Sequence, residues 1–121
     1  MRKALRPRMK LWLSTSTSEG VFGDGKWRLL KAINEKSSLR AAAEWLDISY
    51  RKAWGDLQKA EKQLGVALIE KRRGGKDHGS ASLTEEGRKW LKAYALFRAD
   101  VEKSIEKAFK KHVKPIAGQK S

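Results

Sequence analysis

Four consecutive polar residues at the start of a helical pattern have side chains suited to hydrogen-bond recognition. They are Ser49, Tyr50, Arg51 and Lys52. All four can donate hydrogen bonds, and the guanidinium of Arg51 can bind the O6 and N7 atoms of a guanine together. A helix with such donors in its first turns is suited to enter the major groove of a DNA duplex. We therefore predict that these four residues read base edges.

Segment 38–65 has the pattern of two helices joined by a tight break. Ser38 and Ser49 stand where N-cap residues are expected, Asp47 interrupts the apolar pattern, and Gly65 is suited to end the second helix. Small residues at the crossing allow close approach, as a helix-turn-helix requires. The apolar positions are Leu39, Ala42, Ala43 and Leu46 in the first helix, and Ala53, Leu57, Ala60 and Leu64 in the second.

The preceding segment predicts a small hairpin and a supporting helix. Alternating apolar residues over 9–13 indicate a strand, and Val21-Phe22 a short returning strand. A helix over 26–35 follows, with its N-cap near residues 24–25. Trp27 and Trp45 fall on apolar faces, so we expect both in the core. Trp54 could pack or bind, and because its neighbour Ala53 is on the buried face we favour packing against the supporting helix.

A glycine-rich basic loop follows the second helix of the pair. We predict strands at 67–72 and 81–83, which would form a wing with its tip at residues 71–79. The loop has no sequence motif of a nucleotide-binding loop. Charge at a wing tip is suited to bind phosphates. The residues expected on the DNA backbone are Arg72, Arg73 and Lys76, together with Arg2 and Lys3 from the N-terminal arm.

A long helix is predicted from about residue 85 to residue 112, with Thr84 as its N-cap. Its apolar stripe extends beyond what a small domain needs to cover, which favours dimerisation over folding back on the chain's own core. The expected dimer interface comprises Leu91, Tyr94, Phe97, Val101, Ile105 and Ala108.

The chain thus divides into a basic arm (1–8), a winged helix-turn-helix (9–83), a dimerisation helix (84–113) and a flexible basic tail (114–121). Pro115 and Gly118 are expected to end the helix.

The overall charge is strongly basic. The 121 residues include 28 Lys and Arg against 14 Asp and Glu, a net charge of +14, which implies a polyanionic partner. The chain has no cysteine, and no apolar run approaches the length of a membrane helix. We therefore expect a cytoplasmic protein that does not bind membranes.

The residues for catalysis are few. His78 falls in the wing and His112 near the chain end, and neither has a partner at a spacing that would orient it as a base. Two histidines without cysteines are a poor set for a transition metal. We expect no enzyme activity, no cofactor and no metal site.

Several of these motifs resemble one known family. The strings SLRAAAEWLDISYRKAW from Ser38, LG at 64–65, LIEKR at 68–72, GG at 74–75 and LTEEG at 83–87 are similar to the N-terminal DNA-binding domain of the ModE family of molybdate-responsive transcriptional regulators. A looser likeness to the LysR-type winged helix-turn-helix covers the same span. The resemblance implies a winged-helix homodimer with the long helix in the interface. Full-length ModE regulators carry a further molybdate-binding domain, for which this chain has no room, so we expect it not to bind molybdate or tungstate directly.

The fold class expected is therefore mainly α with a small β component, a winged helix-turn-helix with a long C-terminal dimerisation helix. The function expected is sequence-specific binding of double-stranded DNA by a homodimeric transcriptional regulator, with the recognition helix at about 49–64. One alternative is a non-specific nucleic-acid-binding or architectural protein, which needs the charge but no ordered recognition helix. Another is a protein-interaction module, for which a less basic surface is expected.

Overall fold

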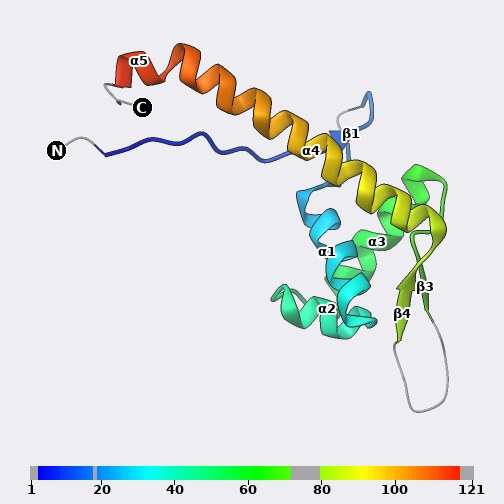
Figure 1. Cartoon of the computed structure of the whole chain (residues 1–121). Helices are drawn as coiled ribbons and strands as arrows, with labels where there is room; N and C mark the ends of the chain where they lie inside the picture. The colour runs from blue at the N-terminus through cyan, green and yellow to red at the C-terminus, as the bar shows by residue number, and fades with distance from the viewer. Residues whose placement is uncertain (1–2, 18, 72–79, 118–121) are drawn as a thin grey trace.

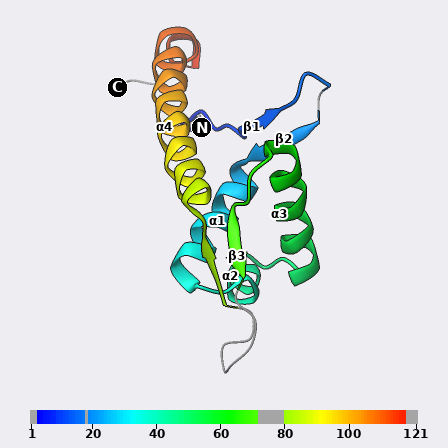
Figure 2. The same cartoon turned by 90° about the vertical axis from the view of Figure 1, so that its right-hand side faces the viewer.

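The computed structural model describes residues 3–17, 19–71 and 80–117. Three helices form a compact head, and a fourth, much longer helix crosses it and extends beyond it (Figure 1). Turning the molecule shows α3 and α4 on opposite sides of the head (Figure 2). The elements are β1 (Trp12–Ser14), β2 (Gly20–Gly23), α1 (Asp24–Lys36), α2 (Leu39–Trp45), α3 (Tyr50–Leu64), β3 (Ile69–Lys71), β4 (Ala81–Leu83), α4 (Glu85–His112) and α5 (Lys114–Ala117).

Side-chain caps begin three of the helices at the predicted residues. The hydroxyl oxygens of Ser38, Ser49 and Thr84 accept from backbone N–H groups at 3.1, 3.0 and 2.9 Å, at the starts of α2, α3 and α4. Each cap satisfies a donor that the first helical turn leaves without a partner. Gly65 ends α3 in the left-handed conformation, with φ of 74°. The predicted helix boundaries are confirmed here.

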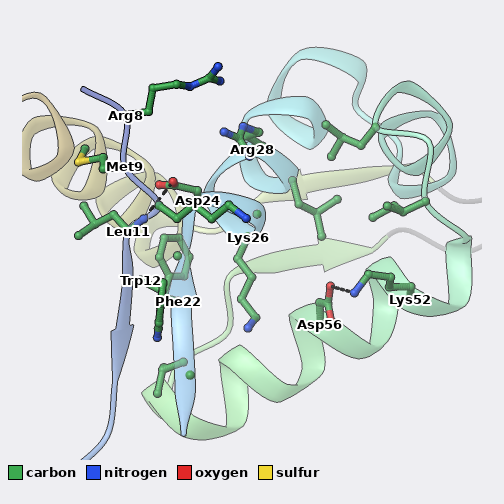
Figure 3. Close-up of a pocket in the computed structure, with 18 residues that line it drawn as sticks. Arg8, Met9, Leu11, Trp12, Phe22, Asp24, Lys26, Arg28, Lys52 and Asp56 are labelled. Atoms are coloured by element: carbon green, nitrogen blue, oxygen red, sulfur yellow. Dashed lines mark hydrogen bonds and ion pairs between the residues drawn. The ribbon is translucent and has the colours of Figure 1, made fainter. Parts of the chain in front are cut away.

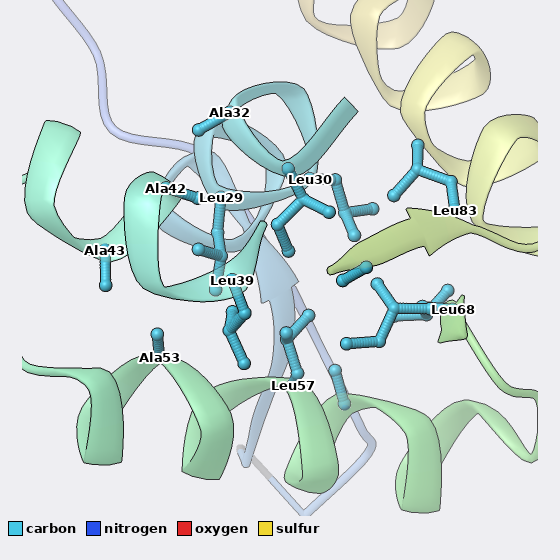
Figure 4. Close-up of a cluster of buried hydrophobic side chains, with 14 of the residues drawn as sticks. Leu29, Leu30, Ala32, Leu39, Ala42, Ala43, Ala53, Leu57, Leu68 and Leu83 are labelled. Carbon is cyan, nitrogen blue, oxygen red and sulfur yellow. The ribbon is translucent and has the colours of Figure 1, made fainter. Parts of the chain in front are cut away.

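The core lies where α1, α2 and α3 meet. Ala43 and Ala53 face each other where α2 crosses α3, and Leu39 and Leu57 fill the adjoining layer (Figure 4). Because alanine side chains are short, the two helix backbones approach closely at this crossing. The predicted helix-turn-helix is confirmed.

Two antiparallel hairpins complete the head. β1 pairs with β2, and β3 pairs with β4 in the register Ile69–Leu83, Glu70–Ser82, Lys71–Ala81. The N–H of Ala81 also donates to the carbonyl of Ser37 at 3.0 Å, which ties β4 to the turn between α1 and α2. The hairpin that follows α3 has the position of a wing. Its first strand begins at Ile69 and not at the predicted Ala67, whose carbonyl accepts from the Thr84 hydroxyl; residue 72, the predicted end of the strand, lies outside the described residues.

The prediction for Trp45 was wrong. Its side chain is 67% exposed, whereas Trp27 is partly buried against the core as expected. Trp45 is the last residue of the short helix α2, whose buried face is formed by Leu39, Ala42 and Ala43. At 100° per residue, position 45 lies well to one side of that face. The ammonium of Lys36 covers the exposed ring at 4.4 Å from its centroid.

Helical structure also resumes after α4. Pro115, predicted to end the helix and begin a tail, lies in the first turn of α5. Proline is tolerated there because a first-turn N–H has no helical acceptor.

The carboxylate of Asp24 joins three parts of the chain. It accepts hydrogen bonds from the N–H of Leu11 at 3.2 Å, the hydroxyl of Tyr94 at 2.7 Å and Nε of Arg98 at 2.9 Å. Burial raises the pKa of this carboxyl, but the hydrogen bonds from Arg98, Tyr94 and Leu11 and the charge of Arg98 outweigh burial and lower the pKa below its ordinary value. α4 is thereby fixed to the start of α1 and to the segment that leads into β1.

Tyr94 was wrongly predicted to lie in a dimer interface. Its side chain is 2% exposed and packs between Phe22, at 5.2 Å between ring centroids, and Trp27, at 5.6 Å. Burial and the hydrogen bond to Asp24 raise the pKa of Tyr94. Its place in the apolar stripe of α4 therefore serves the chain's own core.

Gly87 allows α4 to start directly against the residue that precedes β3. A Cβ atom at this position would lie 2.1 Å from the carbonyl oxygen of Leu68. The backbone at Leu68 has little room to yield, because this residue is fully buried.

We predict that Asp24→Asn lowers the free energy of unfolding at pH 7 by about 1–3 kcal/mol, since Arg98 loses its charged acceptor. The pKa of Asp24 is lower in the folded than in the unfolded chain. The stabilising effect of Asp24 is therefore complete at pH values above its pKa in the unfolded chain. It is lost as the pH falls through its lower pKa in the folded chain. Urea denaturation from pH 7 to pH 2 should show the wild type and the variant converging below about pH 4. Asp100→Asn, at an exposed position of α4, is the control; a gap between wild type and variant that stays constant from pH 7 to pH 2 would contradict the prediction.

Gly87→Ala should lower the free energy of unfolding by about 1–3 kcal/mol, because the added methyl group overlaps the Leu68 carbonyl. Urea midpoints at neutral pH measure the change. Gly25→Ala is the matched control, since a Cβ there meets nothing within 4 Å. An unchanged midpoint for Gly87→Ala would show that the contact is not tight.

Candidate nucleic-acid interface

Helix α3 turns one face to the core and leaves the opposite face exposed. Its buried residues are Ala53, Leu57 and Ala60. The exposed stripe runs along the whole helix at helical spacing and comprises Arg51, Gly55, Gln58 and Lys62. Gln58 and Lys62 were not predicted as site residues, although continuing the spacing from Arg51 would have found them in the sequence.

The four predicted base-reading residues differ in what their side chains do. Arg51 and Lys52 are exposed, and Nζ of Lys52 lies 3.2 Å from the carboxylate of Asp56. Ser49 is exposed but accepts the N–H of Lys52 as the helix cap. Tyr50 is partly buried, and its hydroxyl accepts from Nζ of Lys71. The structure therefore places Arg51 at the centre of the exposed face and Tyr50 at its edge.

Glu61 fixes the wing to α3. Its carboxylate accepts the N–H of Leu68 at 2.7 Å and that of Ile69 at 3.2 Å. These donors belong to the residue directly before β3 and to its first residue. The direction in which β3 leaves α3 is thus set by a side chain of α3 itself.

The flank of α3 beside the wing is aromatic and basic. Nζ of Lys71 lies 5.1 Å from the ring centroid of Tyr50 and 4.5 Å from that of Trp54. The guanidinium of Arg40, on α2, lies 4.8 Å from the Tyr50 centroid. Trp54 is partly buried against the core, in keeping with its predicted packing role.

The other flank of α3 faces the β1–β2 hairpin across an open groove. Figure 3 shows Lys26 and Arg28 of α1, Lys52 and Asp56 of α3, and the Leu11–Phe22 side of the hairpin around this groove. Lys59 of α3 also reaches the hairpin, through an ion pair with Glu19 at 3.3 Å. Burial lowers the pKa of Lys26; the charge of Asp56 opposes this effect, and the charges of Lys59 and Lys52 reinforce it. Five basic side chains line the groove: Arg8, Lys10, Lys26, Arg28 and Lys52.

Of the five predicted backbone-binding residues, the structure describes only Lys3. Arg2, Arg72, Arg73 and Lys76 lie outside the described residues. Lys3 is exposed in the N-terminal segment, which runs beside α4 and away from α3 (Figures 1 and 2). In the described part of the chain, no group of acidic residues and histidines has the arrangement of a metal site. No described helix is long and apolar enough to cross a membrane.

The predicted stripe on α4 has mixed surroundings. Leu91 packs against the core, and Phe97 is 41% exposed. Val101 and Ile105 are partly buried and Ala108 is exposed. Ile105 lines a groove between α4 and the N-terminal segment, which also includes Phe109 and residues 4–9. Leu96, which was not predicted, is 60% exposed next to Phe97.

Comparison with known proteins identifies the family. Residues 25–88, which include α1, α2, α3 and the wing, match the model for bacterial regulatory helix-turn-helix proteins of the lysR family. The chain belongs to the lysR family. In this family context, the exposed stripe on α3 lies on the second helix of the helix-turn-helix.

Curated relatives bear out the predicted likeness to ModE. The chain is 36% identical over 84 residues to the molybdenum-pterin-binding protein MopB of Rhodobacter capsulatus, covering 69% of this chain and 31% of MopB. It is 33% identical over 101 residues to the transcriptional regulator ModE of Haemophilus influenzae, covering 83% of this chain and 38% of ModE. The chain therefore spans about a third of the length of these relatives.

Solved structures confirm the winged helix-turn-helix fold. The DNA-binding domain of CbnR, solved in complex with DNA, matches with a TM-score of 0.56 at 24% identity, covering 69% of this chain and 91% of that one. The DNA-binding domain of BenM, solved with the catB site 1 DNA, matches with a TM-score of 0.56 at 24% identity. This match covers 80% of this chain and 97% of the BenM domain. At this identity the likeness concerns the fold.

Proposed function

We propose that this lysR-family chain binds double-stranded DNA sequence-specifically, as a ModE-like transcriptional regulator. In this proposal α3 lies in the major groove and the wing, residues 71–79, follows the backbone. The observation that carries the proposal is the exposed stripe of α3, which offers a guanidinium, an amide and an ammonium group on a helix held from both flanks. The DNA complexes of CbnR and BenM, which share the fold, support DNA as the partner.

The side chains of the stripe have distinct capacities for recognition. Arg51 can bind a guanine bidentately, and Gln58 can bind the N6 and N7 atoms of an adenine. Between them, Gly55 presents no side chain, and nothing in the described structure lies within 4 Å of a Cβ built there. A glycine inside a helix costs about 0.5–1 kcal/mol relative to alanine. A glycine here would let the helix approach the floor of the groove closely.

The names of the relatives also bear on enzyme activity and cellular location. The ModE proteins of Haemophilus influenzae and Yersinia pestis are described as transcriptional regulators. We infer by this likeness that the chain is a regulator without enzymatic activity and acts in the cytoplasm, where bacterial DNA lies.

The paired arrangement is the second part of the proposal. The middle of α4 leaves Leu96 and Phe97 exposed, at 60% and 41%. We propose that these residues, with Val101, Ile105 and Ala108, meet the same surface of a second copy. Leu91 contributes at the edge of this surface, since it already packs against the core.

Selection from random duplex DNA, followed by binding titrations, tests specific recognition. The wild type should select one sequence and lose about 10³–10⁵ in affinity between 50 and 200 mM salt if a dimer neutralises roughly six to ten phosphates. Arg51→Ala should lose about 1–3 kcal/mol of discrimination at one base pair and keep the salt dependence. Arg73→Ala should weaken binding to all sequences alike. Identical selection profiles for the two variants would contradict this division, and we expect molybdate and tungstate to leave wild-type binding unchanged.

Sedimentation at micromolar concentration tests the dimer. The wild type should sediment as a dimer, and the selected DNA should contain an inverted repeat with half-sites about 34 Å apart or a multiple of that distance. Phe97→Glu should shift the protein to monomer because it places a charge in an apolar contact. Ala99→Glu, which introduces the same side chain two residues away on an exposed position, should remain dimeric. A monomeric wild type would refute the paired arrangement.

A further inference from the structure

Three side chains from three different elements meet at the wing-side edge of α3. Arg40 comes from α2, Tyr50 from the first turn of α3, and Lys71 from the end of β3. The Arg40 guanidinium and the Lys71 ammonium lie 4.8 and 5.1 Å from the centroid of the Tyr50 ring. Lys71 also donates to the Tyr50 hydroxyl and lies over Trp54.

In the described part of the chain, the two cations at this edge have no acidic partner. Among the described residues, no carboxylate lies within ion-pair distance of Arg40 or Lys71, and both side chains are exposed. Two positive charges held around one ring repel each other, so an anion between them would be favoured.

The Tyr50 hydroxyl adds a third donor to this cluster. Because its oxygen accepts from Lys71, its own hydrogen is left to donate elsewhere. Guanidinium, ammonium and hydroxyl together form a donor set suited to an oxyanion that only accepts hydrogen bonds, and a phosphate is such a group. Aromatic contacts hold the two long cationic side chains in place before any ligand binds.

We propose that Arg40, Tyr50 and Lys71 form a binding site for a single phosphodiester group of the DNA backbone, at the edge of the groove that α3 enters. This inference rests on the proposed function and assigns Tyr50 to the backbone rather than to base readout. The site lies where α2, α3 and the wing converge, so one bound phosphate fixes all three elements on the duplex. Arg51 is then the one member of the first turn that reads a base from the centre of the exposed face.

The test uses the duplex selected by the wild type, with single uncharged methylphosphonate linkages placed at each backbone position in turn. Arg40→Gln and Lys71→Gln should each weaken binding roughly three- to tenfold, equally for all sequences, and reduce the slope of log affinity against log salt by about one. Tyr50→Phe keeps the ring and should give a smaller loss. Lys31→Gln is the matched control, because Lys31 makes the same kind of ring contact with Trp27 at 4.7 Å, on the side of α1 that faces α4.

One methylphosphonate position per half-site should weaken wild-type binding and have no further effect on Arg40→Gln or Lys71→Gln. Additive losses at every position, or variants that bind within twofold of the wild type, would overturn the site while wild-type selection still upheld sequence-specific binding. A wild type that binds no duplex would overturn both. Inorganic phosphate at constant ionic strength should displace DNA no better than chloride does; stronger displacement from the wild type than from Lys71→Gln would identify a free-anion site and overturn the assignment to the backbone.

Discussion

The position of the long helix depends on one carboxylate. Asp24 lies at the start of α1, where the helix dipole favours a negative charge, and it accepts from groups on both sides of it in the chain. With Arg98 on α4 and Leu11 before β1, it joins residues that lie 74 and 13 positions away. The surrounding aromatic rings of Phe22, Trp27 and Tyr94 exclude water and so strengthen this contact. Without it, Arg98 would have no charged partner on the head, and α4 would be held there by apolar packing and by hydrogen bonds between neutral groups or to backbone carbonyls, such as that from the Tyr94 hydroxyl to the carbonyl of Leu11.

Helix α3 is also held by several contacts: a side-chain cap, close packing against α2, hydrogen bonds to the start of the wing and an ion pair with the β1–β2 hairpin. The Ser49 cap sets its first turn, and the Ala43–Ala53 crossing sets its distance from α2. On one flank Glu61 holds the start of the wing, and on the other Lys59 reaches the β1–β2 hairpin. The stripe that faces solvent is therefore presented by a rigid helix. Binding by such a surface loses little conformational freedom.

Local patterns in the sequence predicted most of the fold and only part of the site. The caps at Ser38, Ser49 and Thr84 and the wing after Gly65 follow from short-range rules, and each is confirmed. The errors at Trp45 and Tyr94 arose because an apolar residue at helical spacing does not reveal which partner covers it. The cluster of Arg40 and Lys71 around Tyr50 was missed for a related reason, since it joins residues up to 31 positions apart that share no motif.

The anchoring of α4 at Asp24 has a geometric consequence for the paired protein proposed above. Arg98 lies in the middle of α4, and the 14 residues that follow it to His112 are about 21 Å long at 1.5 Å per residue. A tilt of about 10° at Arg98 moves the far end of the helix by roughly 4 Å, close to the rise of one base pair, about 3.4 Å. The ion pair between Asp24 and Arg98 is then the fixed point about which the outer half of α4 is oriented. The distance between the two half-sites would then depend on the angle between α4 and the head of each subunit. The contact that sets this angle lies far from the residues proposed to contact DNA.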